Sequence, residues 1–358
     1  MKVLKKIICK ILPLICLITS VCAGLGCASQ GSAHDFYYFQ TEVHVQTQTT
    51  TLSSKTITQI DGLLSSLEST FAINKTGSFT ARFNNSNVGN VNADPTVISV
   101  IKACKSLYEF TDGAFNPAVL PLVKLWQFDK YPAINFTPPS KALIQSVLDS
   151  GALDFGLVTF DEINKTVYKP HADMQIDLGG IVKGYACERI ATILRDNGHA
   201  DGYVNLGGSS LTLVKMPSLG VAHPRKDGTI ISIDTSKDVN LSISTSGDYQ
   251  RYYEYQDIRY SHVIDVKVGA PANSTVASAT ITGIDGTLAD GLSTALCVCT
   301  YSAETDTLTP MINKILSSYP NAAIYAVIID GQNKLIVSNK TCGEDYTIKD
   351  TTFNAVKI

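Results

Sequence analysis

The sequence predicts an α+β fold in which largely antiparallel sheets pack against helices. Strand-like segments outnumber the helices that could cross over between parallel strands. Several of these segments also follow one another through short turns, most clearly across residues 256–258 and 331–333. A doubly wound parallel sheet would instead need a long helix after nearly every strand.

The first half of the chain supplies a strand and three helices. The strand is expected over FYYFQTEVHVQTQ (36–48), where apolar and polar residues alternate. Residues 52–71 place their apolar side chains on one helical face, and the Asp-Pro pair at 94–95 is typical of a helix start. A third helix is expected over 140–151, where serine caps the start and glycine ends it.

The second half begins with two strands, at 155–161 and 165–169. A helix over 182–197 and a strand with a tight glycine turn at 202–208 come next. The remaining elements are expected as strands at 229–235, 239–245, 251–256 and 259–266, helices at 288–300 and 307–318, and a closing hairpin of 323–330 with 334–339.

Composition limits the class of protein and of partner. The chain has 358 residues, of which 44% are hydrophobic, enough to fill a large core. Its formal net charge of -3 gives no general attraction for nucleic acid or anionic lipid, so no nucleic-acid partner is expected. Any phosphate binding must therefore come from a local site.

The N-terminus has the pattern of a secretory leader. Three lysines precede a mostly apolar run over residues 7–25, and small and polar residues follow. The GLGC sequence resembles a bacterial lipobox, in which Cys27 would be lipidated and become the mature N-terminus. We therefore expect a leader over 1–27, a tether over 28–35, and an extracytoplasmic lipoprotein anchored to the bacterial cell membrane. A secreted or periplasmic protein with an ordinary cleaved signal, or one with an uncleaved anchor, are the alternatives.

The cysteines outside this leader form no disulfide framework and no zinc pattern. They are odd in number and unrelated in spacing: Cys104, Cys187, Cys297, Cys299 and Cys342. Cys297 and Cys299 lie in the apolar run ALCVC, where small core residues are expected.

The segment DLGG, from Asp177 to Gly180, is a candidate phosphate cradle. Adjacent glycines let the backbone approach a ligand closely, and the following helix presents free N–H groups to an anion. Lys183, in the first helical turn, opposes the helix dipole unless an anion lies beside it. An exposed lysine beside an ordinary turn would give the same pattern.

The segment TLADGLSTAL is a candidate cation site. Asp290 and Thr294 lie four residues apart and share one helical face, with Ser293 one step round. Carboxylate and hydroxyl oxygens suit Mg²⁺, which also keeps water and phosphate oxygens as ligands. An aspartate that merely caps a helix is the alternative.

Two further segments could complete a site. His262 stands on an expected strand, and a histidine near pH 7 is a natural proton acceptor for a hydroxyl nucleophile, although lone histidines are usually structural. The segment DGAFNPAVLPLVKLWQF, which holds the single tryptophan, could sandwich a flat ring or simply pack on the core.

Taken together, these segments resemble the FAD:protein FMN transferase family, the ApbE-like lipoproteins. The family pattern runs from a GxxDxTxxPLxxLW-like segment through DLGGIAKGYAxD, VNLGGD, TSGxYERY with SHIIDPxTGxP, and ADALSTAL. This chain has, in the same order, GAFNPAVLPLVKLW, DLGGIVKGYACE, VNLGGS, TSGDYQRY with SHVIDVKVGAP, and ADGLSTAL. The resemblance implies one domain over residues 36–358, with a T-fold-like, two-lobed architecture and the cofactor in the cleft.

The resemblance also implies a ligand set and a reaction. FAD would be the bound substrate, and His262 would accept the proton of a threonine or serine of a second protein. That hydroxyl would attack the FMN phosphorus and release AMP. The expected acceptors are extracytoplasmic, such as subunits of membrane redox complexes or flavoprotein domains. The implied Mg²⁺ ligands are the Gly180 carbonyl, Asp290, Thr294 and Ser293, and the implied flavin contacts are Ala114, Phe115, Asn116, Asp177, Lys183, Ile264, Phe39 and Phe71.

Several positions depart from the family pattern. Asn116 stands where many members have aspartate, and Ser209 follows VNLGG where aspartate or asparagine is usual. Phe39 lies in a reduced version of a methionine-glycine-threonine strand, and Phe71 replaces a tyrosine or tryptophan. Two alternative functions would use the same site. One is a metal-dependent FAD pyrophosphatase with water as nucleophile, and the other is a noncatalytic FAD-binding lipoprotein.

Overall fold

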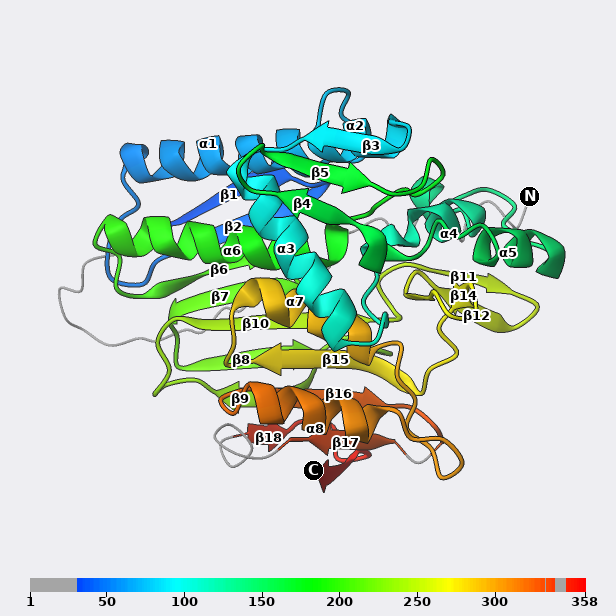
Figure 1. Ribbon diagram of the computed structural model, residues 1–358. Helices are drawn as coiled ribbons and strands as arrows, with labels where there is room; N and C mark the ends of the chain where they lie inside the picture. The colour runs from blue at the N-terminus through cyan, green and yellow to red at the C-terminus, as the bar shows by residue number, and fades with distance from the viewer. Residues whose placement is uncertain (1–30, 332, 339–345) are drawn as a thin grey trace, which may run out of the picture.

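A nine-stranded sheet forms the centre of the molecule, with helices across one face (Figure 1). The computed structural model describes residues 31–331, 333–338 and 346–358. Neighbouring strands of this sheet pair antiparallel, except for the last pair, β17 and β19. The predicted α+β class with largely antiparallel sheets is confirmed. No helix in the described part of the chain is long and apolar enough to cross a membrane.

The central sheet draws its strands from the whole chain. In sheet order they are β1 (Ala33–Tyr38), β2 (Thr41–Gln46), β6 (Gly202–Leu206), β7 (Ser210–Lys215), β10 (Leu241–Gly247), β15 (Val276–Thr282), β16 (Ala323–Ile328), β17 (Lys334–Val337) and β19 (Asn354–Lys357).

The other described strands form four smaller sheets. They are β18 (Tyr346–Ile348) with β9 (Thr229–Asp234) and β8 (Ser218–Ala222), β3 (Gly89–Asn92) with β5 (Thr166–Lys169) and β4 (Thr159–Asp161), β11 (Tyr252–Tyr255) with β12 (Ile258–Ser261), and β13 (Ile264–Asp265) with β14 (Ala270–Pro271).

The helices vary from single turns to five turns. The α-helices are α1 (Ser54–Phe71), α2 (Phe79–Asn85), α3 (Pro95–Phe110), α4 (Leu120–Leu125), α5 (Lys141–Leu148), α6 (Gly179–Asp196), α7 (Gly286–Leu296) and α8 (Leu308–Ser318). Short 3-10 turns are η1 (Pro117–Val119), η2 (Phe128–Lys130) and η3 (Phe155–Leu157). The predicted caps are present, since Asp94 accepts from the Val97 N–H and Ser140 from the Leu143 N–H.

Strand β16 shows how the layers are built, because all six of its residues are buried. Alternate side chains point to opposite faces of a strand. Ile324, Ala326 and Ile328 enter the large core beneath the helices. Tyr325 and Val327 enter a second core, which the β8, β9 and β18 sheet closes from the other side. The sheet is therefore covered on both faces at this point.

The N-terminal strand differs from its prediction. Residues 36–48 were expected to form one strand, but the chain turns back at Phe39 and Gln40, which both have positive φ (54° and 58°). The result is the β1–β2 hairpin, in which Tyr38 pairs with Thr41. Strand β1 begins at Ala33, so residues 33–35 belong to the sheet and not to the predicted tether over 28–35. The leader and Cys27 lie outside the described residues.

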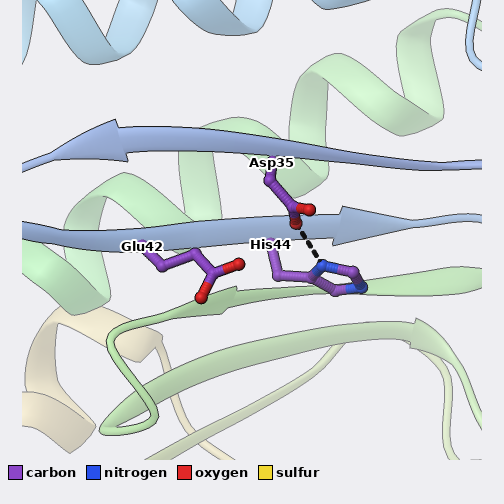
Figure 2. Close-up of side chains that lie close together, drawn as sticks. All are labelled: Asp35, Glu42 and His44. Atoms are coloured by element: carbon purple, nitrogen blue, oxygen red, sulfur yellow. Dashed lines mark hydrogen bonds and ion pairs between the residues drawn. The ribbon is translucent and has the colours of Figure 1, made fainter. Parts of the chain in front are cut away.

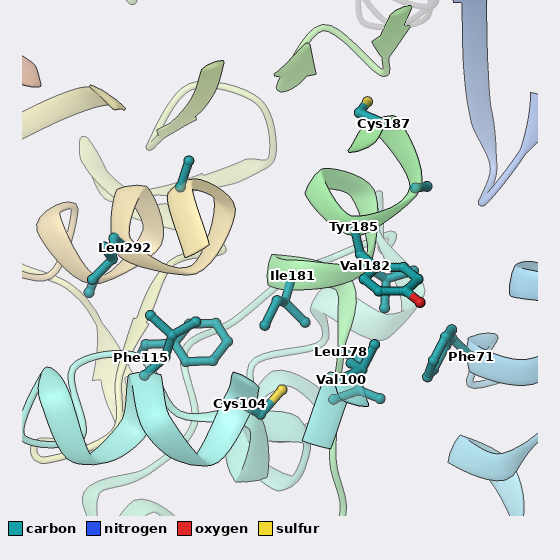
Figure 3. Close-up of a cluster of buried hydrophobic side chains, with 14 of the residues drawn as sticks. Phe71, Val100, Cys104, Phe115, Leu178, Ile181, Val182, Tyr185, Cys187 and Leu292 are labelled. Atoms are coloured by element: carbon teal, nitrogen blue, oxygen red, sulfur yellow. The ribbon is translucent and has the colours of Figure 1, made fainter. Parts of the chain in front are cut away.

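Helices α6 and α7 cross in close contact above the sheet, and glycine makes this possible. A Cβ atom added to Gly184 would overlap the carbonyl oxygen of Gly286 and lie 2.9 Å from the Asp290 Cβ. Apolar side chains pack beside this crossing. Figure 3 shows Phe115 beside Ile181, between the helices that carry Cys104 and Leu292.

A separate aromatic cluster supports the segments around β11 to β14. Phe136 stacks on Tyr253 with ring centroids 4.1 Å apart, and Trp126 stacks on Tyr260 at 5.5 Å. The Trp126 Nε1–H donates to the Gly269 carbonyl at 2.9 Å, which satisfies the indole in this buried setting. The tryptophan therefore holds the fold together here.

Four cysteines lie in the described part of the chain, and all are buried and free. Burial raises the pKa of the Cys104, Cys187 and Cys297 thiols far above the ordinary value and that of Cys299 to about 11. These four cysteines form no disulfide with one another in the structure. Cys342 lies outside the described residues.

Candidate functional site

Asp177 organises the start of helix α6. Its Oδ1 accepts the Gly179 N–H at 2.8 Å, and its own N–H donates to the Pro117 carbonyl at 2.8 Å. The helix begins at Gly179, three residues before the predicted start at Val182. The DLGG segment and the segment around Asn116, which are far apart in the sequence, therefore lie side by side.

Lys183 lies between the start of this helix and a buried carboxylate. Its Nζ donates to the Gly179 carbonyl at 2.5 Å and stands 3.9 Å from Oδ2 of Asp290. About a quarter of the side chain is exposed, at 26%. The ammonium is thus held at the helix N-terminus while it remains within reach of a ligand.

Asp290 is the centre of the site, with 2% of the residue exposed. Its Oδ2 accepts the Gly184 N–H at 3.0 Å. In an α-helix this N–H is the one that bonds to the carbonyl of Gly180, four residues earlier. A carbonyl has two acceptor lone pairs, so sharing this donor with Asp290 leaves the Gly180 oxygen able to take another partner. Among the described residues, Oδ1 of Asp290 has no hydrogen-bond partner.

The hydroxyl groups predicted from TLADGLSTAL gather beside Asp290. Ser293 and Thr294 donate to the Asp290 carbonyl at 2.9 and 3.2 Å. Ser246, at the end of β10, lies 2.8 Å from the Ser293 hydroxyl and 3.1 Å from the Thr294 hydroxyl. The result is a compact set of oxygen atoms drawn from α7 and the central sheet.

Gly180 faces this oxygen set from helix α6. A Cβ atom at Gly180 would lie 3.5 Å from Oγ1 of Thr294 and 3.4 Å from the Phe115 ring. The helix backbone therefore approaches both residues at contact distance. The structure thus brings together Gly180, Lys183, Asp290, Ser293, Thr294 and Phe115.

The donor set fits a hard divalent cation. A carboxylate oxygen, two hydroxyls and a backbone carbonyl are all oxygen ligands, which Mg²⁺ prefers, and open positions would remain for water and phosphate oxygens. Within the residues that the structure describes, the buried carboxylate is paired with a single cation, Lys183 at 3.9 Å. These residues could therefore hold Mg²⁺ without rearranging the fold.

His262 lies in the loop between β12 and β13, and its ring has a defined orientation. Nδ1 is 3.2 Å from the Arg251 carbonyl oxygen. A carbonyl can only accept, so Nδ1 carries the hydrogen and Nε2 keeps its lone pair. The Phe128 ring meets the imidazole edge-on at a centroid distance of 6.4 Å. The atom that can accept a proton is therefore Nε2.

The surroundings of His262 keep it neutral. Desolvation, followed by the positive charge of Arg251, lowers the pKa of His262 from 6.5 to about 4. Lys183 contributes in the same direction. The imidazole is therefore available as a proton acceptor at neutral pH.

Three other predicted flavin contacts lie in or against the packed core. Asn116 is buried, and its side chain donates to the Leu153 carbonyl and accepts from the Ala118 N–H. Ala114, two residues earlier, packs partly buried against the core, and Ile264 is buried in the aromatic cluster. These assignments remain predictions, and the Asn116 side chain acts in the fold as a support for the loop.

Phe39 and Phe71 lie on the side of the core near the N-terminal hairpin. The Phe39 N–H donates to Oε1 of Glu68 at 2.8 Å, which ties the hairpin turn to α1. Phe71 ends α1 and is 4% exposed, and Figure 3 shows it on the same side of α6 as Tyr185. Both assignments also remain predictions.

Three supporting residues were not predicted from the sequence. Ser246 orients the α7 hydroxyls, Arg251 holds His262 through its carbonyl, and Glu188 accepts from the Gly286 N–H at 2.8 Å at the start of α7. Ser246 and Arg251 lie within the segment TSGDYQRY, and Glu188 ends the segment DLGGIVKGYACE, so the family pattern was the signal that could have found them. Helical and strand spacing alone assigns none of them a role.

Comparison with known proteins gives a consistent result. The ApbE family model matches residues 39–313. A protein of Vibrio cholerae named FAD:protein FMN transferase is 29% identical over 256 residues, covering 68% of this chain and 74% of that protein. A protein of Treponema pallidum with the same name is 30% identical, covering 58% of this chain and 61% of that protein.

Solved structures agree on the fold. The crystal structure of the ApbE protein of Thermotoga maritima superposes with a TM-score of 0.72 at 28% identity, covering 84% of this chain and 94% of that one. The flavin transferase ApbE of Vibrio cholerae also gives a TM-score of 0.72, at 21% identity, covering 85% of this chain and 95% of that one. The predicted ApbE-like architecture is confirmed.

Proposed function

The chain belongs to the ApbE family, and on that premise we propose that it is a Mg²⁺-dependent FAD:protein FMN transferase. It would move FMN from FAD to a threonine or serine hydroxyl of an extracytoplasmic protein and release AMP. The single observation that carries this proposal is the buried oxygen cluster around Asp290, with the hydroxyls of Ser293 and Thr294 beside it and the Lys183 ammonium 3.9 Å from the carboxylate. His262, which is neutral near pH 7, is the candidate proton acceptor. A cation site and a proton acceptor together provide what phosphoryl-type transfer requires.

The cation site would consist of Asp290, Thr294, Ser293 and the Gly180 carbonyl. When bound, Mg²⁺ would neutralise charge on the pyrophosphate of FAD and orient it. Asp290 supplies the negative charge, and its free Oδ1 is the available ligand atom. The hydroxyls of Ser293 and Thr294 are held in place by Ser246.

Lys183 and the α6 N-terminus would bind the nucleotide. The lysine ammonium and the first free N–H groups of the helix favour an anion at this point. Asp177 fixes the turn before the helix, so these donors face a defined direction. Phe115 and its neighbours Ala114 and Asn116 close the same region from the loop after α3.

His262 would act as the general base. Its Nε2 accepts the proton of the acceptor hydroxyl, while Nδ1 stays bonded to the Arg251 carbonyl. The bond that forms joins the acceptor oxygen to the phosphorus of the FMN half. The bond that breaks joins that phosphorus to the bridging pyrophosphate oxygen, which leaves as part of AMP.

One reaction mixture tests this proposal against two other outcomes. The protein is incubated with FAD, Mg²⁺ and a protein domain that bears an acceptor threonine, and the acceptor is then denatured and examined for flavin fluorescence. Fluorescence on the acceptor together with AMP supports transfer. FMN and AMP without labelled acceptor would show an FAD pyrophosphatase, and unchanged FAD would show a binding protein, so either result would overturn the proposal.

The compartment of the reaction is inferred from the leader alone. The lysines, the apolar run over 7–25 and the GLGC sequence support export and lipidation of Cys27. Radiolabelled palmitate should enter the protein, and Cys27→Ser should abolish that labelling. Labelling that persists in this variant would remove the lipoprotein assignment.

A further inference from the structure

We propose that Asp35, Glu42 and His44 form a Zn²⁺ site on the outer face of the N-terminal hairpin. Asp35 lies directly opposite His44 in the register of β1 and β2, and Glu42 is two residues before His44 on the same strand. Directly opposed residues, and residues two apart, share one face of a sheet. Figure 2 shows the three side chains together on that face.

The hairpin fixes this face firmly. Val43 and Val45, which alternate with Glu42 and His44 along β2, are completely buried in the core under the helices. Slipping the register by one residue would move these valines into water. The three polar side chains therefore cannot turn inward, and they lie on the opposite face of the sheet from the helix α6 site.

The donor atoms are already close to one another. The imidazole, Asp35 and Glu42 each offer one ligand atom, and all three atoms lie within 4.8 Å of one another. Nδ1 of His44 is 2.5 Å from Oδ1 of Asp35. Ligand atoms around tetrahedral zinc lie about 3 to 4 Å apart, given Zn–N and Zn–O bonds of about 2 Å. Small rotations of two exposed carboxylates would therefore admit the ion.

Charge on this face also favours a cation. A simple ion pair would account for the contact between Asp35 and His44. It would not account for the position of Glu42, which is the third member of the cluster. In the described part of the chain, the Glu42 side chain has no ion pair and no hydrogen bond. Two carboxylates beside a single imidazole leave negative charge that a divalent ion would neutralise.

The donor types distinguish this site from the one at Asp290. One imidazole nitrogen and two carboxylates suit zinc and its neighbours, whereas Mg²⁺ prefers oxygen ligands alone. The ring is supported as metal-bound histidines usually are, because Nε2 lies 3.5 Å from Oε1 of Gln46, which can accept its hydrogen. A water would complete a tetrahedral shell.

A metal here would clamp the hairpin that ends in the Phe39 turn. That turn is tied to α1 through the Phe39 N–H and Glu68. Binding at Asp35, Glu42 and His44 would join β1 to β2 a few residues away. The role we infer is structural, and it does not depend on flavin transfer.

The test is zinc binding by the full-length protein without FAD, measured by titration calorimetry in excess Mg²⁺ so that the oxygen site is filled. We expect one zinc per chain. His44→Gln and Glu42→Gln should each weaken binding at least about tenfold. His34→Gln is the matched control, since this histidine lies in β1 on the opposite face from Asp35, and it should bind as the parent does.

Each result has a clear meaning. Equal zinc affinity in His44→Gln and the parent, or no binding by the parent, would overturn the site. Glu42→Gln keeps the shape of an exposed side chain, so it remains a fair test if His44→Gln folds poorly. Co²⁺ gives a second readout, because its visible absorption should appear in the parent and in His34→Gln but not in His44→Gln. Because FAD is absent, failure here is separate from failure of the proposed transferase activity.

Discussion

The backbone N–H of Gly184 donates to the buried carboxylate of Asp290 at 3.0 Å, and this bond joins the two helices that form the oxygen site. It occurs where α6 and α7 approach so closely that only glycine fits. The same contact thus positions the proposed metal ligand and fixes the packing of the helices. A mutation of Asp290 should therefore act mainly on activity, and a mutation of Gly184 mainly on stability.

Asp290→Asn should remove activity while preserving the fold. Asparagine keeps an oxygen that can accept the Gly184 N–H, but it loses the negative charge that would hold Mg²⁺. Turnover should fall by at least ~10²-fold, since even changes to groups outside a metal's ligands cost 10- to 100-fold. The measurement is AMP release over a range of Mg²⁺ concentrations. Full activity in this variant, or rescue by high Mg²⁺, would contradict the assignment.

Gly184→Ala should destabilise the protein. The added methyl group would overlap the Gly286 carbonyl, and backbone cannot move aside as a side chain can. We expect a loss of about 3 kcal/mol or more in the free energy of unfolding, the upper end for overpacked cores. Urea denaturation followed by circular dichroism measures this.

Gly62→Ala is the matched control for that variant. Gly62 is exposed within α1, and nothing lies within 4 Å of an added Cβ. Alanine is the better helix former by about 1 kcal/mol, so this change should stabilise the protein slightly. Equal effects of the two substitutions would show that the α6–α7 contact is looser than described.

In the pH profile of transferase activity, the loss of activity on the acid side should occur near pH 4. The pKa of His262 is lowered from 6.5 to about 4, so the imidazole of the free enzyme is neutral above about pH 4 and can accept a proton. The value of kcat/KM for the acceptor should therefore be constant from pH 7 down to pH 5 and be lost as the pH falls through 4. A midpoint at 6.5 would contradict the described environment.

His262→Gln supplies the control for the pH profile. It should lower the rate about 10²- to 10⁴-fold, as loss of a general base does, and remove the limb near pH 4. Circular dichroism across the same pH range separates protonation of His262 from acid unfolding. A variant that kept the parent profile would show that another group titrates.

Ser246→Ala should raise the Mg²⁺ requirement. The serine hydroxyl lies 2.8 Å from that of Ser293 and 3.1 Å from that of Thr294, and without it both can rotate. We expect a 10- to 100-fold weaker response to Mg²⁺, of the order seen when outer partners of metal ligands are removed. Ser69→Ala, which removes one exposed helical hydroxyl, is the control and should have no effect. An unchanged Mg²⁺ dependence would show that Ser246 does not position these ligands.

The fold could be predicted wherever local signals were strong. The closing hairpin of β16 and β17 forms as predicted, because two apolar runs flank a glycine-containing turn. The β1–β2 hairpin was missed because its turn residues, Phe39 and Gln40, adopt positive φ without the glycine or asparagine that usually marks such turns. The parallel pairing of β17 with β19 involves a C-terminal strand that was not predicted, and periodicity does not reveal which strands pair.

In the candidate site, too, local spacing predicted some features, whereas others depend on tertiary contacts. Helical spacing correctly placed Asp290, Ser293 and Thr294 together, since residues three and four apart share a face. Their approach to Gly180 could not be deduced from spacing, because it depends on the crossing of two helices separated by about a hundred residues. The orientation of His262 depends on a backbone carbonyl, which every residue possesses and no pattern identifies.

The four buried thiols have a practical consequence. Each is deeply buried, and burial holds its pKa well above the ordinary value, so little reactive thiolate forms near neutral pH. The part of the chain that contains them is therefore indifferent to the redox potential of its surroundings. Once the protein is folded, these four thiols should react only slowly with a soluble thiol reagent, and unfolding in denaturant should expose them to it.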